Sequence, residues 1–296
     1  MKHVFVCGLH RSGTTILAKS IGDFENCTLF RDTGVLMDEG QFLQNVYPAD
    51  IAHGGAGRFG FKREAHLTEA SSVLTADAAE RLRSAWQRHW DPDKSIRVEK
   101  TPGNLLMTRF LQAVFPSAYF IIIRRDPVAV ALATQKWSRT SLNSLFDHWL
   151  RCHDIFTADK PHLEHCYQLT YEDYTSDPQK YMFEIATFLG LTVRGGTDWP
   201  TIKNYNDRYL DQWRSMTQNP LYRSYCLHLI AKYGDRFSQY GYSFSTESAL
   251  TCAATSKGKC TMIAGRFICS LADACTVPLR LEGSIRYRTK RLLKRI

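Results

Sequence analysis

One short segment constrains the fold of this 296-residue chain more than any other. Residues Gly8–Thr15 read GLHRSGTT and match the pattern G-x-x-x-x-G-x-[ST]. An apolar run, His3–Cys7, precedes the segment, and Thr14–Ile21 follows it with apolar residues at helical spacing. Glycines in such a strand–loop–helix unit let successive backbone N–H groups point at one anion, and the helix N-terminus adds partial positive charge. The segment predicts a phosphate-binding loop; a glycine turn in an ordinary βα unit is the alternative.

Strand and helix patterns alternate along the rest of the chain. The clearest strand pattern is Ala118–Ile123, a run of apolar, β-branched or aromatic residues typical of a strand covered on both faces. Further strands are predicted at Ile96–Val98 and Cys166–Thr170. Helices are predicted at residues 41–46, 75–89, 105–114, 128–137, 142–156 and 178–189. This alternation predicts an α/β fold with a mainly parallel central sheet flanked by helices, in a P-loop nucleotide-binding architecture.

The periodic pattern weakens after about residue 245. We therefore expect a folded domain at 1–245 and a loosely ordered extension at 246–296 that ends in a basic tail. In the tail, Ser284–Ile296, the apolar residues fall on one face of a possible helix and bases occupy other positions. Weak contact with an anionic membrane is one expectation for this tail, and a frayed, solvated tail is the other.

Composition excludes several classes of protein. Hydrophobic residues make up 44% of the chain and charged residues 23%, which rules out wholesale disorder. No run approaches the roughly 20 apolar residues that span a bilayer, and no signal-peptide pattern precedes the first strand. We therefore expect a soluble, cytoplasmic protein. The nine cysteines include no CxxC pair, so a zinc cluster is not expected.

The loop lacks the lysine that nucleotide-hydrolysing loops carry. Thr14 stands at that position, before Thr15, and the cation of the loop is Arg11. The strand Ala118–Ile123 continues into Arg124–Pro127, which brings positive charge to the edge where open parallel sheets bind ligands. No apolar strand ends in an aspartate suited to Mg²⁺. These features favour an anion with several phosphates, bound without a metal.

The motifs of the chain resemble those of the sulfotransferases that use 3′-phosphoadenylyl sulfate (PAPS). Arg11–Thr15 is similar to the 5′-phosphosulfate loop of the family, in the arginine form of the tyrosylprotein and bacterial-type branches. Glu99–Pro102 resembles the E-K-T-P segment of carbohydrate-acting branches, and Ala118–Pro127 resembles the strand and turn whose arginine binds the 3′-phosphate. Residues 169–173 and 177–191 are similar to the Y-E-D-L, D-P and F-L-G-L motifs. The resemblance covers about residues 1–195.

The resemblance implies a sulfotransferase that moves the sulfuryl group of PAPS to a hydroxyl acceptor by in-line displacement. A glycan or a small metabolite is the implied acceptor, and no nucleic acid partner is expected. The expected PAPS-binding residues are His10, Arg11, Ser12, Gly13, Thr14, Thr15, Arg125 and Thr134. Thr134 is included because its neighbour Ala133 stands where the family usually has a serine.

Three residues are expected to carry the chemistry. Charge accumulates on the bridging oxygen as its bond breaks, so a cation is needed there, and Arg11 is the cation of the loop. The resemblance implies that Glu39 is the base for the acceptor proton. The alternatives for this base are Glu99, His10 and His53. The resemblance also implies that Lys100 lies near the sulfuryl group, with a structural ion pair to Glu99 as the alternative.

Two other functions stay open at the level of sequence. One is a P-loop nucleotide kinase or phosphotransferase, which would need the missing lysine and an acid for Mg²⁺. The other is a catalytically inactive nucleotide-binding module. The acceptor pocket is expected in loops, at Gly40–Lys62 and Trp199–Trp213, because such pockets are usually built from loops.

Overall fold

The structure, a computed structural model, describes residues 1–192 and 199–244. These residues form two compact units, one of residues 1–125 with 151–204 and the other of residues 126–150 with those from 205 onward. The extension expected at 246–296 and its basic tail lie outside the described residues. The single domain expected at 1–245 therefore stays a prediction.

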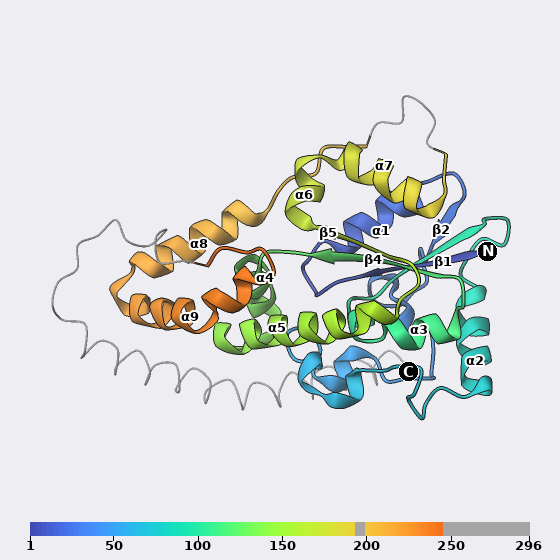
Figure 1. Ribbon diagram of the computed structural model, residues 1–296, viewed down its shortest axis with the longest axis horizontal. Helices are drawn as coiled ribbons and strands as arrows, with labels where there is room; N and C mark the ends of the chain where they lie inside the picture. The colour runs from blue at the N-terminus through green and yellow to red at the C-terminus, as the bar shows by residue number, and fades with distance from the viewer. Residues whose placement is uncertain (193–198, 245–296) are drawn as a thin grey trace. The chain divides into compact units, whose positions relative to one another are not determined.

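The first unit is built on a five-stranded sheet of order β2-β3-β1-β4-β5 in which all strands are parallel (Figure 1). The strands are β1 (Lys2–Cys7), β2 (Cys27–Leu29), β3 (Ile96–Lys100), β4 (Ala118–Arg124) and β5 (Cys166–Thr170). The predicted α/β class is confirmed, and so are four of the five strands. The short β2 was not predicted, because three residues are too few to show an alternating pattern.

Helices cover both faces of this sheet. In Figure 1, α1 (Thr14–Gly22), α6 (Tyr171–Ser176) and α7 (Pro178–Leu189) lie on one face, and α2 (Ala76–Gln87) and α3 (Thr108–Val114) lie on the other. Local signals explain several helix starts. The side chains of Thr75, Thr170 and Asp177 accept hydrogen bonds from backbone N–H groups in the first turns of α2, α6 and α7.

Two of the predicted helices are wrong in extent. The helix expected at 41–46 is only a single 3₁₀ turn, Gly40–Phe42. The Gln44 side chain explains this: its amide N–H donates to the Gln41 carbonyl, and its oxygen accepts from the N–H groups of Val46 and Tyr47. These bonds replace the helical ones. The helix expected at 105–114 begins only at Thr108, because 102–106 forms a 3₁₀ turn after Pro102.

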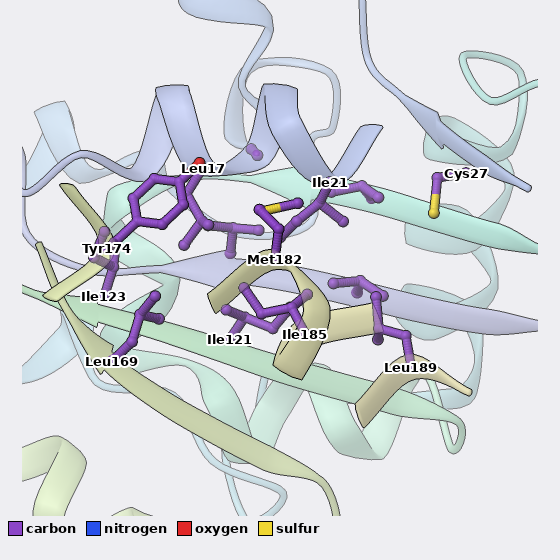
Figure 2. Close-up of a cluster of buried hydrophobic side chains, with 14 of the residues drawn as sticks. Leu17, Ile21, Cys27, Ile121, Ile123, Leu169, Tyr174, Met182, Ile185 and Leu189 are labelled. Atoms are coloured by element: carbon purple, nitrogen blue, oxygen red, sulfur yellow. The ribbon is translucent and has the colours of Figure 1, made fainter. Parts of the chain in front are cut away.

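The strands have a period of two, and this period places the core on both faces of the sheet. Val4 and Val6 belong to a buried cluster on one face with side chains of α1 and α7, among them Ile21 and Ile185 (Figure 2). Phe5, between the two valines, packs on the other face against Trp86 and Phe115, with ring centroids 6.2 and 5.5 Å away. The sheet is therefore covered by side chains on both faces.

The second unit is helical. It contains α4 (Pro127–Ser138), the first part of α5 (Leu142–Asp159), α8 (Asn206–Gln218) and α9 (Pro220–Ser238). Rings of Phe146, Trp213, Phe237 and Phe244 contact one another in its core. The loop expected at Trp199–Trp213 is thus partly wrong, since α8 begins at Asn206 and Trp213 is buried. Across the two described ranges, we find no helix with the length and apolar character needed to cross a membrane.

Two isoleucines of α1 provide a matched test of this core. Ile21 has no exposed surface, whereas Ile16 is 39% exposed. We expect Ile21→Ala to lower the free energy of unfolding by about 2–5 kcal/mol, through lost burial and the cavity left behind. Ile16→Ala should change it by about 0.5 kcal/mol or less. Urea unfolding measures both; equal effects would contradict the described packing of α1.

Candidate active site

The carboxyl ends of the strands bring the predicted site residues to one edge of the sheet. In the register of the sheet, Val6 of β1 pairs with Lys100 of β3, and Arg124 of β4 pairs with Thr170 of β5. The loop after β1, the turn after β3 and the segments after β4 and β5 therefore leave the sheet at the same edge. This is the edge where open parallel sheets place their ligands.

The loop after β1 has the curled backbone that its glycines predicted. Gly13 has a φ of 96° and Arg11 a φ of 68°, so both lie in the left-handed region. Gly8 lies so close to β4 that a Cβ atom there would stand 2.3 Å from the Ile123 carbonyl oxygen. Ser12 has no exposed surface, and its hydroxyl has no hydrogen-bond partner within the described ranges. A buried hydroxyl of this kind favours a bound ligand that supplies the bond.

Arg125 joins this loop to the end of β4. Its guanidinium donates from Nη1 to the Arg11 carbonyl oxygen at 2.7 Å and lies over the Tyr171 ring, 4.1 Å from the centroid. The Tyr171 ring also contacts the loop, because a Cβ atom on Gly13 would stand 2.7 Å from Cδ2 of the ring. The sequence analysis assigned no role to Tyr171. This residue follows β5 directly, and β5 pairs with β4, so Tyr171 leaves the sheet beside Arg125.

The predicted catalytic pair Glu39 and Lys100 is brought together by the fold. Lys100 Nζ lies 2.8 Å from Glu39 Oε1, and both side chains are buried. Lys100 also donates to the Met37 carbonyl, and Gln41 Nε2 donates to Glu39 Oε2 at 2.7 Å. The structural ion pair considered for Lys100 thus forms with Glu39 instead of Glu99. Gln41 was missed by the sequence reasoning, although it stands only two residues after Glu39.

Glu99 is fully buried and anchors the Glu39 segment. Its carboxylate accepts hydrogen bonds from the Gly40 N–H at 2.9 Å, the Thr101 hydroxyl and the Asn104 amide. Burial raises the pKa of Glu99 to about 7, against the opposing effect of the hydrogen bonds. The Gly40 carbonyl accepts from the Trp86 indole N–H at 2.9 Å. Gly40 is therefore held on both sides, which positions Glu39 and Gln41 beside it.

A line of polar contacts runs from Glu39 to the phosphate loop. Gln41, bonded to Glu39, accepts a hydrogen bond from the Asp50 backbone N–H through its Oε1 at 2.8 Å. The Asp50 carboxylate lies 3.0 Å from His10 Nε2. Asp50 was missed because nothing in its local sequence marks it. The structure thereby places His10, expected to bind PAPS, in contact with the segment that carries Glu39.

The other expected site residues are placed as follows. Arg11 is exposed at the loop, Thr14 and Thr15 form the first turn of α1, and Thr14 is buried. His53 ends a 3₁₀ turn, and partial burial lowers its pKa. Thr134 is buried on α4 in the second unit. Its role in binding stays a prediction.

Gly13 provides a test of the loop geometry. A residue with a Cβ in the left-handed region costs about 1–2 kcal/mol, and at Gly13 the new methyl group would also collide with Tyr171. Gly34 has a φ of 80°, and a methyl group there would meet nothing within 4 Å, so Gly34→Ala isolates the backbone cost. We expect Gly13→Ala to reduce the unfolding free energy clearly more than Gly34→Ala in urea titrations. Equal losses would mean that the Tyr171 contact is absent.

The raised pKa of Glu99 predicts how stability depends on pH. Between about pH 4.5 and 7 the folded state retains a proton that the unfolded state has released, so the contribution of Glu99 to stability falls as pH rises through this window. Glu99→Gln should remove this fall. Its amide can be accommodated by a flip of Asn104, whose Oδ1 has no partner in the described structure. Urea midpoints from about pH 4.5 to 8 test this; identical profiles for the two proteins would contradict a raised pKa.

Similarity to known proteins is found among solved structures, whereas comparison with curated protein sequences gave no match. The chain is similar to sulfotransferase STF1 of Mycobacterium tuberculosis (18% identity, 66% of this chain and 68% of that one, TM-score 0.42). It is also similar to the sulfotransferase domain of the Synechococcus PCC 7002 olefin synthase (14%, 91% and 94%, 0.45). A third is retinol dehydratase in complex with retinol and PAP (18%, 66% and 62%, 0.36).

A protein-family model also matches this chain. The model of the sulfotransferase family matches residues 3–195, a span that contains the phosphate loop, Glu39, Lys100 and Arg125. This span is more than half of the chain and coincides with the region in which the sequence motifs lie. The chain therefore belongs to the sulfotransferase family and is a PAPS-dependent sulfotransferase.

Proposed function

We propose that the loop Gly8–Thr15 and Arg125 hold PAPS, that Glu39 accepts the proton of the hydroxyl acceptor, a glycan or a small metabolite, and that Lys100 lies near the sulfuryl group. The observation that carries this proposal is the contact between Arg125 and the Arg11 carbonyl oxygen. It joins the residue proposed for the 3′-phosphate to the loop proposed for the 5′-phosphosulfate. A single ligand with an anionic group at each position would contact both the loop and Arg125.

The residues present fit such a ligand. Gly8 and Gly13 let the loop pack closely against β4 and Tyr171, and the Ser12 hydroxyl is buried without a partner in the described ranges. Arg11 and Arg125 supply two positive charges to bind anions. Thr14 at the usual lysine position, together with the family match, does not favour the nucleotide kinase. The family match also does not favour the second alternative, a catalytically inactive nucleotide-binding module.

The proposed reaction is an in-line displacement at sulfur. A bond forms between the acceptor oxygen and the sulfur, and the bond from sulfur to the bridging oxygen of the 5′-phosphate breaks. The acceptor proton passes to the Glu39 carboxylate, and the electron pair of the broken bond stays on the 5′-phosphate. Arg11 stabilises this developing negative charge. Lys100 offsets part of the cost of burying the Glu39 carboxylate.

Binding of the nucleotide product tests the donor site. We expect adenosine 3′,5′-bisphosphate (PAP) to raise the Tm of the protein, and ATP with Mg²⁺ to raise it less at equal concentration. At about 100 times Kd a ligand stabilises by roughly 2.7 kcal/mol, which a thermal-shift assay detects easily. Binding of ATP without binding of PAP would overturn the proposed donor site.

Arg125 provides the sharpest single test of the assignment. We expect Arg125→Ala to weaken PAP affinity by about 1.5–3 kcal/mol, the scale of a hydrogen bond to a charged group. Arg124→Ala is the matched control, since adjacent residues on an extended chain face opposite ways, and it should weaken affinity less. Isothermal titration calorimetry measures both. Unchanged affinity in Arg125→Ala would show that this arginine does not bind the 3′-phosphate.

Two further proposals concern the location of the protein in the cell and the role of its basic tail. We propose a cytoplasmic location and weak contact of Ser284–Ile296 with anionic membrane surfaces, supported by the basic composition of this segment. Co-sedimentation with anionic and neutral vesicles, using the full chain and a chain that ends at Phe244, measures the membrane contact. Equal binding of the two chains would contradict the membrane proposal.

A further inference from the structure

The histidine of the phosphate loop is held by residues from outside the loop. His10 Nε2 lies 3.0 Å from Oδ2 of Asp50, and the Phe59 ring packs edge-on against the imidazole with ring centroids 5.8 Å apart. Asp50 and Phe59 belong to two 3₁₀ turns of the segment that follows Glu39, within the first unit. The position of the His10 ring is therefore set by a different part of the chain.

Asp50 is itself fixed by its backbone and by packing. Its N–H donates to Gln41 Oε1 at 2.8 Å, and its carbonyl oxygen accepts from the Gly55 N–H at 2.9 Å. A Cβ atom on Gly103 would stand 3.4 Å from the Asp50 Cβ, so this side chain packs against the turn that follows β3. The Asp50 carboxylate is therefore held in one place beside the His10 ring.

The charge of Asp50 needs a positive partner. The side chain is buried, and its Oδ2 accepts no well-aligned hydrogen bond within the described ranges. A buried carboxylate without a counter-charge is costly to the fold. Burial lowers the pKa of the nearby His53, against the opposing effect of Glu64 and Asp50, so His53 is uncharged at pH 7. The ion-pair contact of Asp50 in the described part of the chain is with His10.

The other ring nitrogen of His10 is left for a further group. Nδ1 is buried and has no hydrogen-bond partner among the described residues. A carboxylate only accepts hydrogen bonds, so the nitrogen that faces Asp50 carries a hydrogen. In the protonated ring Nδ1 also carries a hydrogen and is a donor. The surrounding loop, Gly8–Thr15, is the segment proposed to hold the 5′-phosphosulfate, whose oxygens accept hydrogen bonds.

We propose that Asp50 is a positioning residue for the sulfuryl donor: it holds His10 as an imidazolium, and His10 donates from Nδ1 to an oxygen of the 5′-phosphosulfate. Anionic groups at both ring nitrogens favour the charged form, against the positive charge of Arg11, the next residue of the loop. A charge-assisted bond of this kind is stronger than a neutral one. The inference rests on the proposed function, because it takes the loop to hold PAPS.

Two nucleotides and two matched variants test the role of Asp50. Asp50→Asn removes the charge and keeps the size of the side chain. Asp159→Asn is the control, because Asp159 is also buried and lies 2.8 Å from a histidine nitrogen, that of His66. By isothermal titration calorimetry of the full chain at pH 7, we expect Asp50→Asn to weaken PAP binding about 3- to 10-fold and Asp159→Asn to leave it unchanged.

The second nucleotide is adenosine 3′-monophosphate, which lacks the 5′-phosphate. Its affinity should be the same in the unmodified protein and in Asp50→Asn, because it has no group for His10 to contact. Unchanged PAP affinity in Asp50→Asn would overturn the proposal. An equal loss of affinity for the two nucleotides would overturn it as well, since it would show a general disturbance of the site.

A double-mutant cycle shows whether Asp50 acts through His10. His10→Gln should weaken PAP binding at least about 10-fold, the scale of a hydrogen bond to a charged group. In the His10→Gln protein the additional change Asp50→Asn should have no effect on PAP affinity, because no imidazole is left to position. Additive losses would contradict the proposal, since Asp50 would then act independently of His10.

The protonation of His10 is observable without any change at Asp50. NMR of the imidazole nitrogens distinguishes a nitrogen that carries hydrogen from one that does not, and the His10 signals are those absent from His10→Gln. In the unmodified protein saturated with PAP at pH 7, we expect hydrogen on both ring nitrogens. A neutral His10 ring would overturn the proposal, and this result does not depend on whether Asp50→Asn folds.

These measurements distinguish failure of the donor site from failure of the role assigned to Asp50. If PAP does not bind the unmodified protein, the proposed donor site fails before any variant is tested. If PAP binds and its affinity does not depend on Asp50, the donor site stands and the positioning role of Asp50 is wrong.

Discussion

The fully buried carboxylate of Glu99 holds together the part of the site that contains Glu39 and Lys100, the residues proposed to act in catalysis. It lies near the end of a central strand and binds the Gly40 N–H, a residue 59 positions earlier in the chain. A segment with little regular structure is thereby fixed to the rigid edge of the sheet. The ion pair of Glu39 with Lys100 and the hydrogen bond from Gln41 to Glu39 depend on this anchor, because Glu39 and Gln41 flank Gly40.

Burial of the Glu99 carboxylate lowers the stability of the fold, but it also fixes the position of Glu39. Burying a carboxylate without a full counter-charge is unfavourable, and the raised pKa of Glu99 expresses that cost. The hydrogen bonds from Thr101, Asn104 and Gly40 offset part of it. What the protein gains is a single geometry for Glu39, which the role proposed for it as the base requires.

The part of the site that we propose to bind the nucleotide is organised by an aromatic ring. Tyr171 lies against both Gly13 and the Arg125 guanidinium, so one side chain sets the distance between the loop and the end of β4. This also explains the glycine at position 13 by contact as well as by backbone angle. The two parts of the site meet at His10, which belongs to the loop and lies 3.0 Å from the carboxylate of Asp50.

The sequence by itself determined the features that depend on local chemistry. Apolar periodicity predicts the strands β1, β3, β4 and β5. The glycines predict the curled loop at Gly8–Thr15, and the residues after β4 predict the charge at its end. All of these signals are visible within a few residues.

The tertiary structure decided which side chains contact one another. Lys100 meets Glu39 instead of its neighbour Glu99, Tyr171 reaches Gly13, and Asp50 meets His10. The helix expected at 41–46 is absent because the Gln44 side chain bonds to the backbone there. The helix α8 occupies part of the loop expected at Trp199–Trp213. The contacts of Lys100, Tyr171 and Asp50 join residues that are far apart in the chain. No local pattern encodes which distant side chain will fill a given space, because packing and burial select that side chain only when the chain has folded.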